Sequence, residues 1–108
     1  MDTKQFNNEV HQVVELIPKG RVTSYGAIAK ALGYGTARMV GHAMGMIDDQ
    51  IKVLPAHRVV NSSGHISPPE SSGGKWRIEM LESEGVAIRN GKVAKFKELF
   101  WDPAIEIE

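Results

Sequence analysis

From its residue pattern, the sequence predicts a small single domain, either mostly α-helical or α/β, that contains a helix-turn-helix. The chain has 108 residues, of which 42% are hydrophobic, enough for one modest core. Apolar residues recur at helical spacing through the first 17 residues. Two further helical patterns are short and are joined only by residues 33–35, which is typical of a helix-turn-helix. We expect one domain over residues 1–108, without internal repeats or linkers.

The first helix is expected to begin at Asp2, which has capping-box spacing to Gln5. Pro18 and Gly20 end it. A short extended piece, residues 21–23, follows. The predicted buried face of this helix consists of Phe6, Val10, Val13, Val14 and Ile17.

The helix-turn-helix is predicted from two capping residues and a glycine. Ser24 caps a helix over residues 25–32, and Gly33 ends it as a left-handed C-cap. Thr36 caps a third helix over residues 37–47. The inward residues are predicted to be Ile28, Ala31 and Leu32 in the former, and Val40, Ala43, Met44 and Ile47 in the latter.

The opposite face of the third helix has small residues, which suits contact with a partner. Ala37, Arg38, Gly41, His42 and Gly45 lie on it. A glycine within a helix costs about 1 kcal/mol relative to alanine. Tolerated weakness, close helix packing or close approach of a partner's backbone would each explain the glycines, and on this motif the partner could be DNA.

The second half of the chain predicts a strand over residues 51–54, a turn over 61–64 and a polar loop over 65–74. A helix is expected over residues 75–84, with Trp76, Met80 and Leu81 as packing residues and Gly85 as its stop. The dipeptide Asn90-Gly91 predicts a hairpin. Residues 99–101 are expected to dock a tail, about 97–108, that is otherwise partly flexible and frays from residue 106.

The formal net charge is zero, but cations cluster early in the chain. Lys19, Arg21, Lys30 and Arg38 fall in residues 19–47, which contain no acid. This distribution suits a small nucleic-acid footprint with modest salt dependence, although a solvated surface would also explain it. The acids gather later, at Glu79, Glu82, Glu84, Glu98, Asp102, Glu106 and Glu108.

The composition excludes several kinds of chemistry. There is no cysteine, which removes disulfides, thiolate nucleophiles and zinc sites that need sulfur. The four histidines, at positions 11, 42, 57 and 65, lack the spacing of a zinc motif, so we expect neither metal nor cofactor. The N-terminus does not resemble a signal peptide and no apolar run is long enough to span a membrane. We therefore expect a soluble, cytoplasmic monomer, nucleoid-associated if bacterial.

Residues 17–26, 37–41 and 54–60, followed by Glu84-Gly85-Val86, closely resemble the C-terminal domain of O6-alkylguanine-DNA alkyltransferases. The order and spacing match from Phe6 to about Val86. The resemblance implies that family's fold, a mostly α, winged-helix-like domain with a helix-turn-helix and short strands, without the family's N-terminal domain.

Where the family has Pro-Cys-His-Arg, this chain has Pro55-Ala56-His57-Arg58. In the enzymes that cysteine takes the alkyl group irreversibly, activated through the histidine and a glutamate, here His57 and Glu84. Alanine has no nucleophilic atom. The chain therefore resembles the alkyltransferase-like proteins, which lack the cysteine, with Pro55, His57, Arg58 and Glu84 as a retained pocket frame.

The resemblance also implies which residues meet DNA. Tyr25 crowds the 3′ phosphate of the target nucleotide and helps to rotate it out of the stack. Arg38 enters from the minor groove and fills the gap. The other expected DNA-binding residues are Thr23, Ser24, Ala37, Gly41 and Gly45. The loop over residues 65–73 has no counterpart of the family's O6-contacting tyrosine, which suggests a wider pocket.

The expected function is recognition of O6-alkylguanine in double-stranded DNA without alkyl transfer, marking the lesion for nucleotide-excision-repair proteins. One alternative is a transferase inactivated by a Cys→Ala change, or a site where His57 activates water to hydrolyse the ether. Another is a transcription factor that uses the helix-turn-helix in the major groove.

Overall fold

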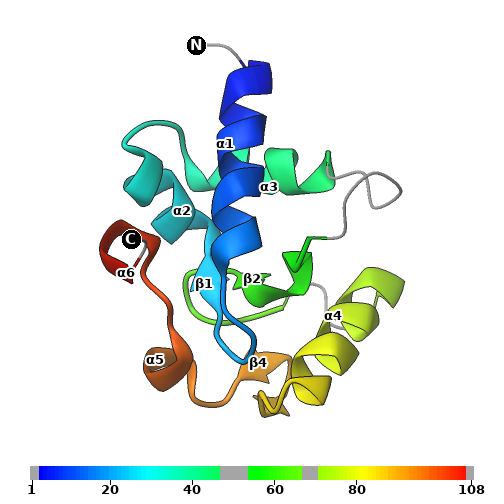
Figure 1. The fold of residues 1–108 in the computed structure, drawn as a ribbon. Helices are drawn as coiled ribbons and strands as arrows, with labels where there is room; N and C mark the ends of the chain where they lie inside the picture. The colour runs from blue at the N-terminus through cyan, green and yellow to red at the C-terminus, as the bar shows by residue number, and fades with distance from the viewer. Residues whose placement is uncertain (1–2, 47–53, 67–70, 107–108) are drawn as a thin grey trace.

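The computed structural model describes residues 3–46, 54–66 and 71–106, and its described residues are mostly helical, as predicted (Figure 1). Helix α1 runs through the middle of the molecule, with α2 and α3 packed against it. The helices and strands are α1 (Thr3–Leu16), β1 (Thr23–Ser24), α2 (Tyr25–Leu32), α3 (Ala37–Gly45), the 3-10 turn η1 (Ala56–Arg58), β2 (Val59–Val60), α4 (Ser72–Ser83), β3 (Ile88–Arg89), β4 (Lys92–Val93), α5 (Phe96–Leu99) and α6 (Pro103–Glu106).

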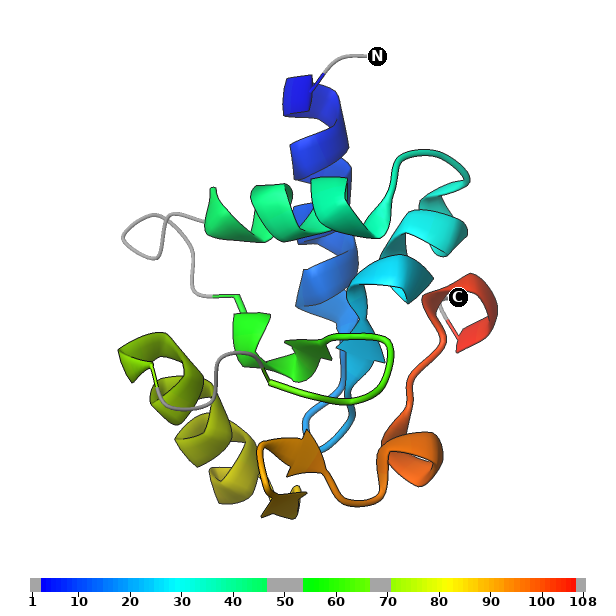
Figure 2. The same ribbon diagram turned by 180° about the vertical axis from the view of Figure 1, so that it is seen from behind.

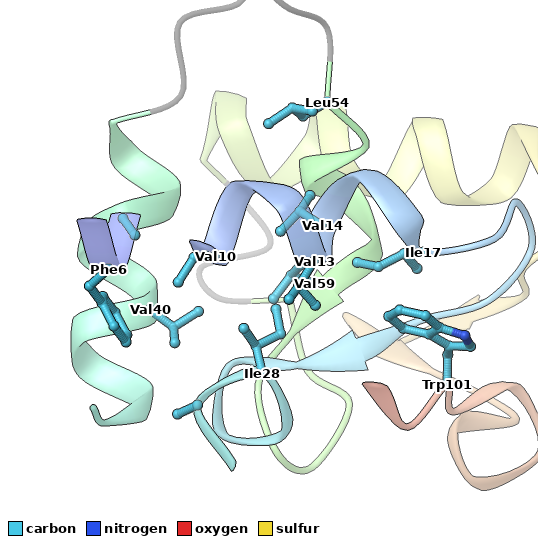
Figure 3. Packing of buried hydrophobic residues seen from close by; sticks show 12 residues of the cluster. Phe6, Val10, Val13, Val14, Ile17, Ile28, Val40, Leu54, Val59 and Trp101 are labelled. Carbon is cyan, nitrogen blue, oxygen red and sulfur yellow. The ribbon is translucent and has the colours of Figure 1, made fainter. Parts of the chain in front are cut away.

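The main core forms where the apolar face of α1 meets α2, α3 and β2 (Figure 3). The five residues predicted for that face, from Phe6 to Ile17, are all buried. They pack with Ile28 of α2, Val40 of α3 and Val59 of β2. Burying an aliphatic side chain of this size contributes about 1.5–3 kcal/mol, so this face fixes the helix-turn-helix against α1.

The predicted caps of the helix-turn-helix are confirmed. Ser24 Oγ accepts a hydrogen bond from Ala27 N at 3.1 Å, and Thr36 Oγ1 accepts one from Met39 N at 3.2 Å. Gly33 ends α2 with φ 82°, a left-handed conformation that favours glycine. Gly35 also has positive φ, and a Cβ there would collide with the ring of Phe6.

The inward residues of these two helices differ partly from the prediction. In α2, Ala29 is buried beside Ile28, whereas Ala31 is only partly buried. Ala29 belongs to the main core cluster together with Ile28. The sequence also did not predict α6, which packs against α2. Helix α3 ends at Gly45 rather than at residue 47, which lies outside the described residues, and Met44 is partly buried.

Two short strand pairs support the rest of the fold. β1 and β2 are parallel, with Thr23 opposite Val59 and Ser24 opposite Val60. Of the strand expected over residues 51–54, only Leu54 is described; it is buried but not in a strand. The predicted hairpin is confirmed as the antiparallel pair β3–β4, and its turn residues Asn90 and Gly91 both have positive φ.

Helix α4 closes a second, smaller core. It begins at Ser72, earlier than predicted, because Ser71 Oγ accepts a hydrogen bond from Gly74 N at 2.9 Å. Of the predicted packing residues, Leu81 is buried, whereas Trp76 is 48% exposed and packs edge-on against His57. The cluster consists of Val22, Val60, Ile66, Leu81, Val86 and Val93.

The tail docks beside β1, as predicted for residues 99–101. Val22 N donates to Leu99 O at 3.1 Å, and Trp101 N donates to Val22 O at 2.7 Å. Trp101 is buried, and α5 and α6, which the sequence did not predict, flank it. The tail's partial flexibility stays a prediction, and residues 107–108 lie outside the described part. Among the described residues, no helix has the length and apolar character to cross a membrane.

Candidate nucleic-acid interface

The exposed face of α3 forms the largest part of the candidate interface. Figure 2 shows α3 crossing in front of α1, with its other side uncovered. Ala37, Arg38, Gly41 and Gly45 are all exposed. The structure therefore brings the predicted α3 residues together on one open surface.

Gly41 and Gly45 do not make room for another part of the described protein. A Cβ built on Gly41 or Gly45 would meet no atom within 4 Å, and neither residue has positive φ. Close helix packing, one of the explanations left open by the sequence, therefore does not account for them within the described residues. A flat helix face leaves room for the backbone of a partner instead.

Arg38 lies beside a hollow of about 310 Å³ between α1 and α3. Its side chain forms no ion pair with the described acids and is exposed. Arg21 differs, because its guanidinium donates to Leu99 O at 2.9 Å and to Phe100 O at 2.6 Å and pairs with Glu106 at 3.2 Å. Arg21, one of the four cations of the predicted basic stretch, is therefore bound to the C-terminal tail of the same chain.

Tyr25 begins α2, directly after β1. Its hydroxyl accepts a hydrogen bond from Arg77 Nη1 of α4 at 3.3 Å. Sequence reasoning missed Arg77, since no local spacing relates residues so far apart; only the packing of α4 shows that they meet. Thr23 and Ser24, also expected to bind DNA, are buried, and the Ser24 hydroxyl caps α2. In this structure these two residues position Tyr25 rather than offering exposed side chains.

The residues of the predicted pocket frame form one hydrogen-bonded network around Glu84. His57 Nε2 lies 2.7 Å from Glu84 Oε2, and Arg58 Nη2 donates to the same oxygen at 2.6 Å. Arg58 Nε donates to Glu84 Oε1 at 3.0 Å, and Arg58 Nη1 to Ile17 O at 2.8 Å. Gly20 N donates to Glu84 Oε1 at 3.3 Å, which joins η1, the end of α4 and the loop after α1.

This network keeps Glu84 ionised. Burial by itself would raise the pKa of Glu84, but the hydrogen bonds from Arg58, His57 and the Gly20 amide outweigh it. Together they lower the pKa from 4.5 to about 2. At neutral pH the carboxylate therefore holds the imidazole of His57 and the guanidinium of Arg58 in fixed orientations.

A cavity of about 550 Å³ adjoins this network, lined by Leu54, Pro55, His57 and Trp76 among others. The ring of Trp76 packs edge-on against His57, with centroids 5.8 Å apart, which explains why this half-exposed tryptophan is held in place. His57 Nδ1 is buried without a partner in the described protein. Ala56, the residue before His57, carries only a methyl side chain and is not among the residues that line this cavity.

The residues of this site include no thiol that could accept an alkyl group. The chain contains no cysteine, and the described acids and histidines nowhere gather in the threes that a metal ion would need. A helix-turn-helix with an uncovered small-residue face, beside a His-Glu-Arg frame that presents alanine, defines a DNA-binding domain of the alkyltransferase type.

Comparison with known proteins gives the family. The chain belongs to the family described as 6-O-methylguanine DNA methyltransferase, DNA binding domain, whose model matches residues 5–86. A DNA base-flipping protein of Vibrio parahaemolyticus is 41% identical over 101 residues, 92% of this chain and 98% of that protein. Alkyltransferase-like protein 1 of Schizosaccharomyces pombe is 38% identical over 109 residues, 95% of this chain and 100% of that protein.

Solved structures show the same likeness. The crystal structure of S. pombe Atl1 in complex with damaged DNA containing O6-carboxymethylguanine matches with a TM-score of 0.83 and 36% identity, over 94% of this chain and 98% of that one. Mycobacterium tuberculosis OGT in complex with DNA matches with a TM-score of 0.59 and 36% identity, over 73% of this chain and 48% of that one. The mostly α fold with a helix-turn-helix and short strands is thus confirmed.

Proposed function

We propose that this protein binds double-stranded DNA at O6-alkylguanine, rotates the modified nucleotide out of the stack, and holds it without removing the alkyl group. The observation that carries this proposal is Ala56 in an otherwise intact frame of Pro55, His57, Arg58 and Glu84. The similarity over 94% of the chain to a protein solved with O6-carboxymethylguanine DNA supports the choice of lesion.

The interface residues have separate roles in this proposal. The flat face of Gly41 and Gly45 lets α3 lie in the minor groove, which is too narrow for a helix with large side chains. Arg38 enters the stack and replaces the extruded base, where its planar guanidinium can stack on the neighbouring bases. Tyr25, held by Arg77, presses on the 3′ phosphate of the target nucleotide.

Absence of transfer follows from the chemistry of position 56. Alkyl transfer needs a nucleophile that forms a bond to the alkyl carbon as the guanine oxygen leaves. A methyl group has no lone pair, and no other residue of this chain is a cysteine. The space that a larger side chain would fill is left to the alkyl group, so the pocket should admit bulky adducts.

A protein that binds a lesion and leaves it unchanged can act by marking it. We propose that the complex recruits nucleotide-excision-repair proteins and that the protein works as a monomer in the cytoplasm, nucleoid-associated if the source is bacterial. A small interface without enzymatic turnover suits this role, because the bound complex persists until a partner arrives.

The test compares binding to one duplex with and without a single O6-methylguanine, followed by mass spectrometry of the DNA. We expect tighter binding to the modified duplex, an unchanged lesion, and protection of the lesion from an active alkyltransferase. Equal affinity for both duplexes would refute the proposal. Tight binding to one undamaged sequence would indicate a transcription factor, and dealkylated guanine after long incubation would indicate hydrolysis by a water that His57 activates.

A further inference from the structure

A second group of cations lies outside the helix-turn-helix, on the hairpin and α5. The segment from Gly85 to Lys97 contains no acid. Its cations, which we call the hairpin patch, are all exposed, and none forms an ion pair with another described residue. The hairpin patch consists of Arg89, Lys92, Lys95 and Lys97.

The hairpin patch carries charge repulsion that the fold itself does not relieve. Arg89 and Lys92 are directly opposite each other, on either side of the Asn90-Gly91 turn. Like charges at such a pair of positions destabilise a hairpin, where opposite charges would stabilise it. Glu98 is the acid that lines the adjoining hollow, of about 530 Å³, together with three of the lysines. This excess of positive charge indicates an anionic partner.

The fold fixes the hairpin patch next to the turn that follows β2. Val93 N donates to Gly64 O at 3.0 Å, and Ile66 N donates to Gly91 O at 2.8 Å. The ring of Phe96 in α5 packs so closely on Gly64 that a Cβ there would lie 2.9 Å from it. Ser62 and Ser63 of the same turn line the hollow that the lysines border.

The same turn lies beside Tyr25. Because β1 and β2 are parallel, their carboxyl ends meet at the same edge of the sheet. Tyr25 follows β1 and Asn61 follows β2 at that edge. Figure 2 shows the loop after β2 between α3 and the hairpin. The longest dimension of the molecule is 38 Å, comparable to one turn of DNA at roughly 34 Å.

We infer that the hairpin patch binds the phosphodiester backbone of the duplex on one side of the lesion, about half a turn to one turn from the extruded nucleotide. The inference rests on the proposed function, in which Tyr25 contacts the target nucleotide. Tyr25 lies at the same edge of the β1–β2 sheet as the turn that packs next to the hairpin patch. Lys92 and Lys95 contact phosphates as point charges and read no sequence. The patch thereby adds affinity and favours a bent duplex that wraps toward it.

The experiment uses a duplex of about 20 base pairs, or about two helical turns, with one O6-methylguanine. A few consecutive phosphates on one side of the lesion, in either strand, are replaced by uncharged methylphosphonates. The wild type should lose affinity for the duplex neutralised at one such block. Lys92→Ala/Lys95→Ala should bind the unmodified duplex about 10-fold more weakly, at roughly threefold per exposed ion pair, and lose all sensitivity to that block.

The matched control is Lys75→Ala, which removes one exposed positive charge on α4, outside both the helix-turn-helix and the hairpin patch. It should keep the sensitivity of the wild type to the neutral block. The slope of log affinity against log salt should fall by about 2 in the double variant, or about 1 for each phosphate that the protein no longer neutralises. Thermal unfolding checks that each variant is folded, as expected for exposed side chains.

The inference is overturned if the double variant binds the lesion duplex as tightly as the wild type, or if both respond equally to every neutral block. Unchanged DNA binding would assign the patch to an acidic protein segment instead. These results differ from failure of the proposed function, in which the wild type itself would not prefer the modified duplex.

Discussion

The network around Glu84 should be the main electrostatic contribution to stability, and Glu84→Gln tests it. The carboxylate is 7% exposed and accepts hydrogen bonds from Arg58, His57 and the Gly20 amide. Its pKa falls from 4.5 to about 2 on folding. At about 1.4 kcal/mol per pKa unit, the interactions of the ionised form contribute about 3 kcal/mol. Glu84→Gln should therefore lower the free energy of unfolding by about 3 kcal/mol at neutral pH.

The pH dependence has a defined direction. Because the folded pKa is lower than the unfolded pKa, the contribution is complete above about pH 5 and declines as the pH falls from 4.5 toward 2. Urea unfolding of wild type and Glu84→Gln across this range measures the difference between the two free energies. Both proteins share the other carboxyl groups, so the titration of those groups cancels in the difference. The difference in unfolding free energy should shrink to near zero at about pH 2.

Glu82→Gln is the matched control, since Glu82 is an exposed carboxylate on the same helix. It should change the free energy of unfolding by no more than about 0.5 kcal/mol. A difference for Glu84→Gln that stays constant from pH 5 to the acid limit would refute the reasoning. The reasoning would also be refuted if Glu84→Gln lowered the free energy of unfolding at neutral pH by no more than Glu82→Gln does.

Four further predictions concern DNA. Arg38→Ala should weaken lesion binding by about 1–3 kcal/mol, and unchanged affinity in a fluorescence titration would remove the proposed insertion into the stack. Gly41→Leu should raise the free energy of unfolding by about 0.5–1 kcal/mol, because leucine favours helix and the site is open, yet reduce DNA binding; full binding would place DNA elsewhere. Arg77→Ala should weaken binding by about 1 kcal/mol in the wild type but not in Tyr25→Phe, as a double-mutant cycle would show if Arg77 acts through that hydroxyl. Ala56→Cys should not restore efficient alkyl transfer: the frame can activate a thiol, but residues 65–73 include no tyrosine to contact O6, and a misplacement of about 1 Å can cost on the order of 100-fold in rate. Rapid stoichiometric labelling of that variant by O6-methylguanine DNA would show that alanine alone prevents transfer.

Local signals in the sequence were sufficient for the helix-turn-helix. The hydroxyls of Ser24 and Thr36 cap α2 and α3, and Gly33 ends α2, as their residue types predict. The apolar spacing of α1 and the Asn90-Gly91 hairpin were also confirmed. These features depend on backbone geometry and on neighbours within a few residues, which a sequence shows directly.

Features that depend on distant packing were not predicted. The sequence could not show that α6 covers α2, nor that the ring of Trp76 stays half exposed against His57. Arg21 looked like part of a basic surface, but the tail binds its guanidinium. In each case the partner lies far along the chain, and no periodicity in the sequence records such a pairing.

The candidate site divides in the same way. By itself the sequence determined its chemistry: position 56 holds alanine, no cysteine exists elsewhere, and small residues recur on one face of α3. Tertiary structure decided which groups meet: the parallel β1–β2 pair sets Tyr25 beside the turn after β2, this turn bonds to the hairpin that carries part of the hairpin patch, and α4 brings Arg77 to the hydroxyl of Tyr25. The physical reason is that the chemistry of a side chain is fixed by its residue type, whereas contacts between distant residues depend on how buried apolar faces pack the elements together.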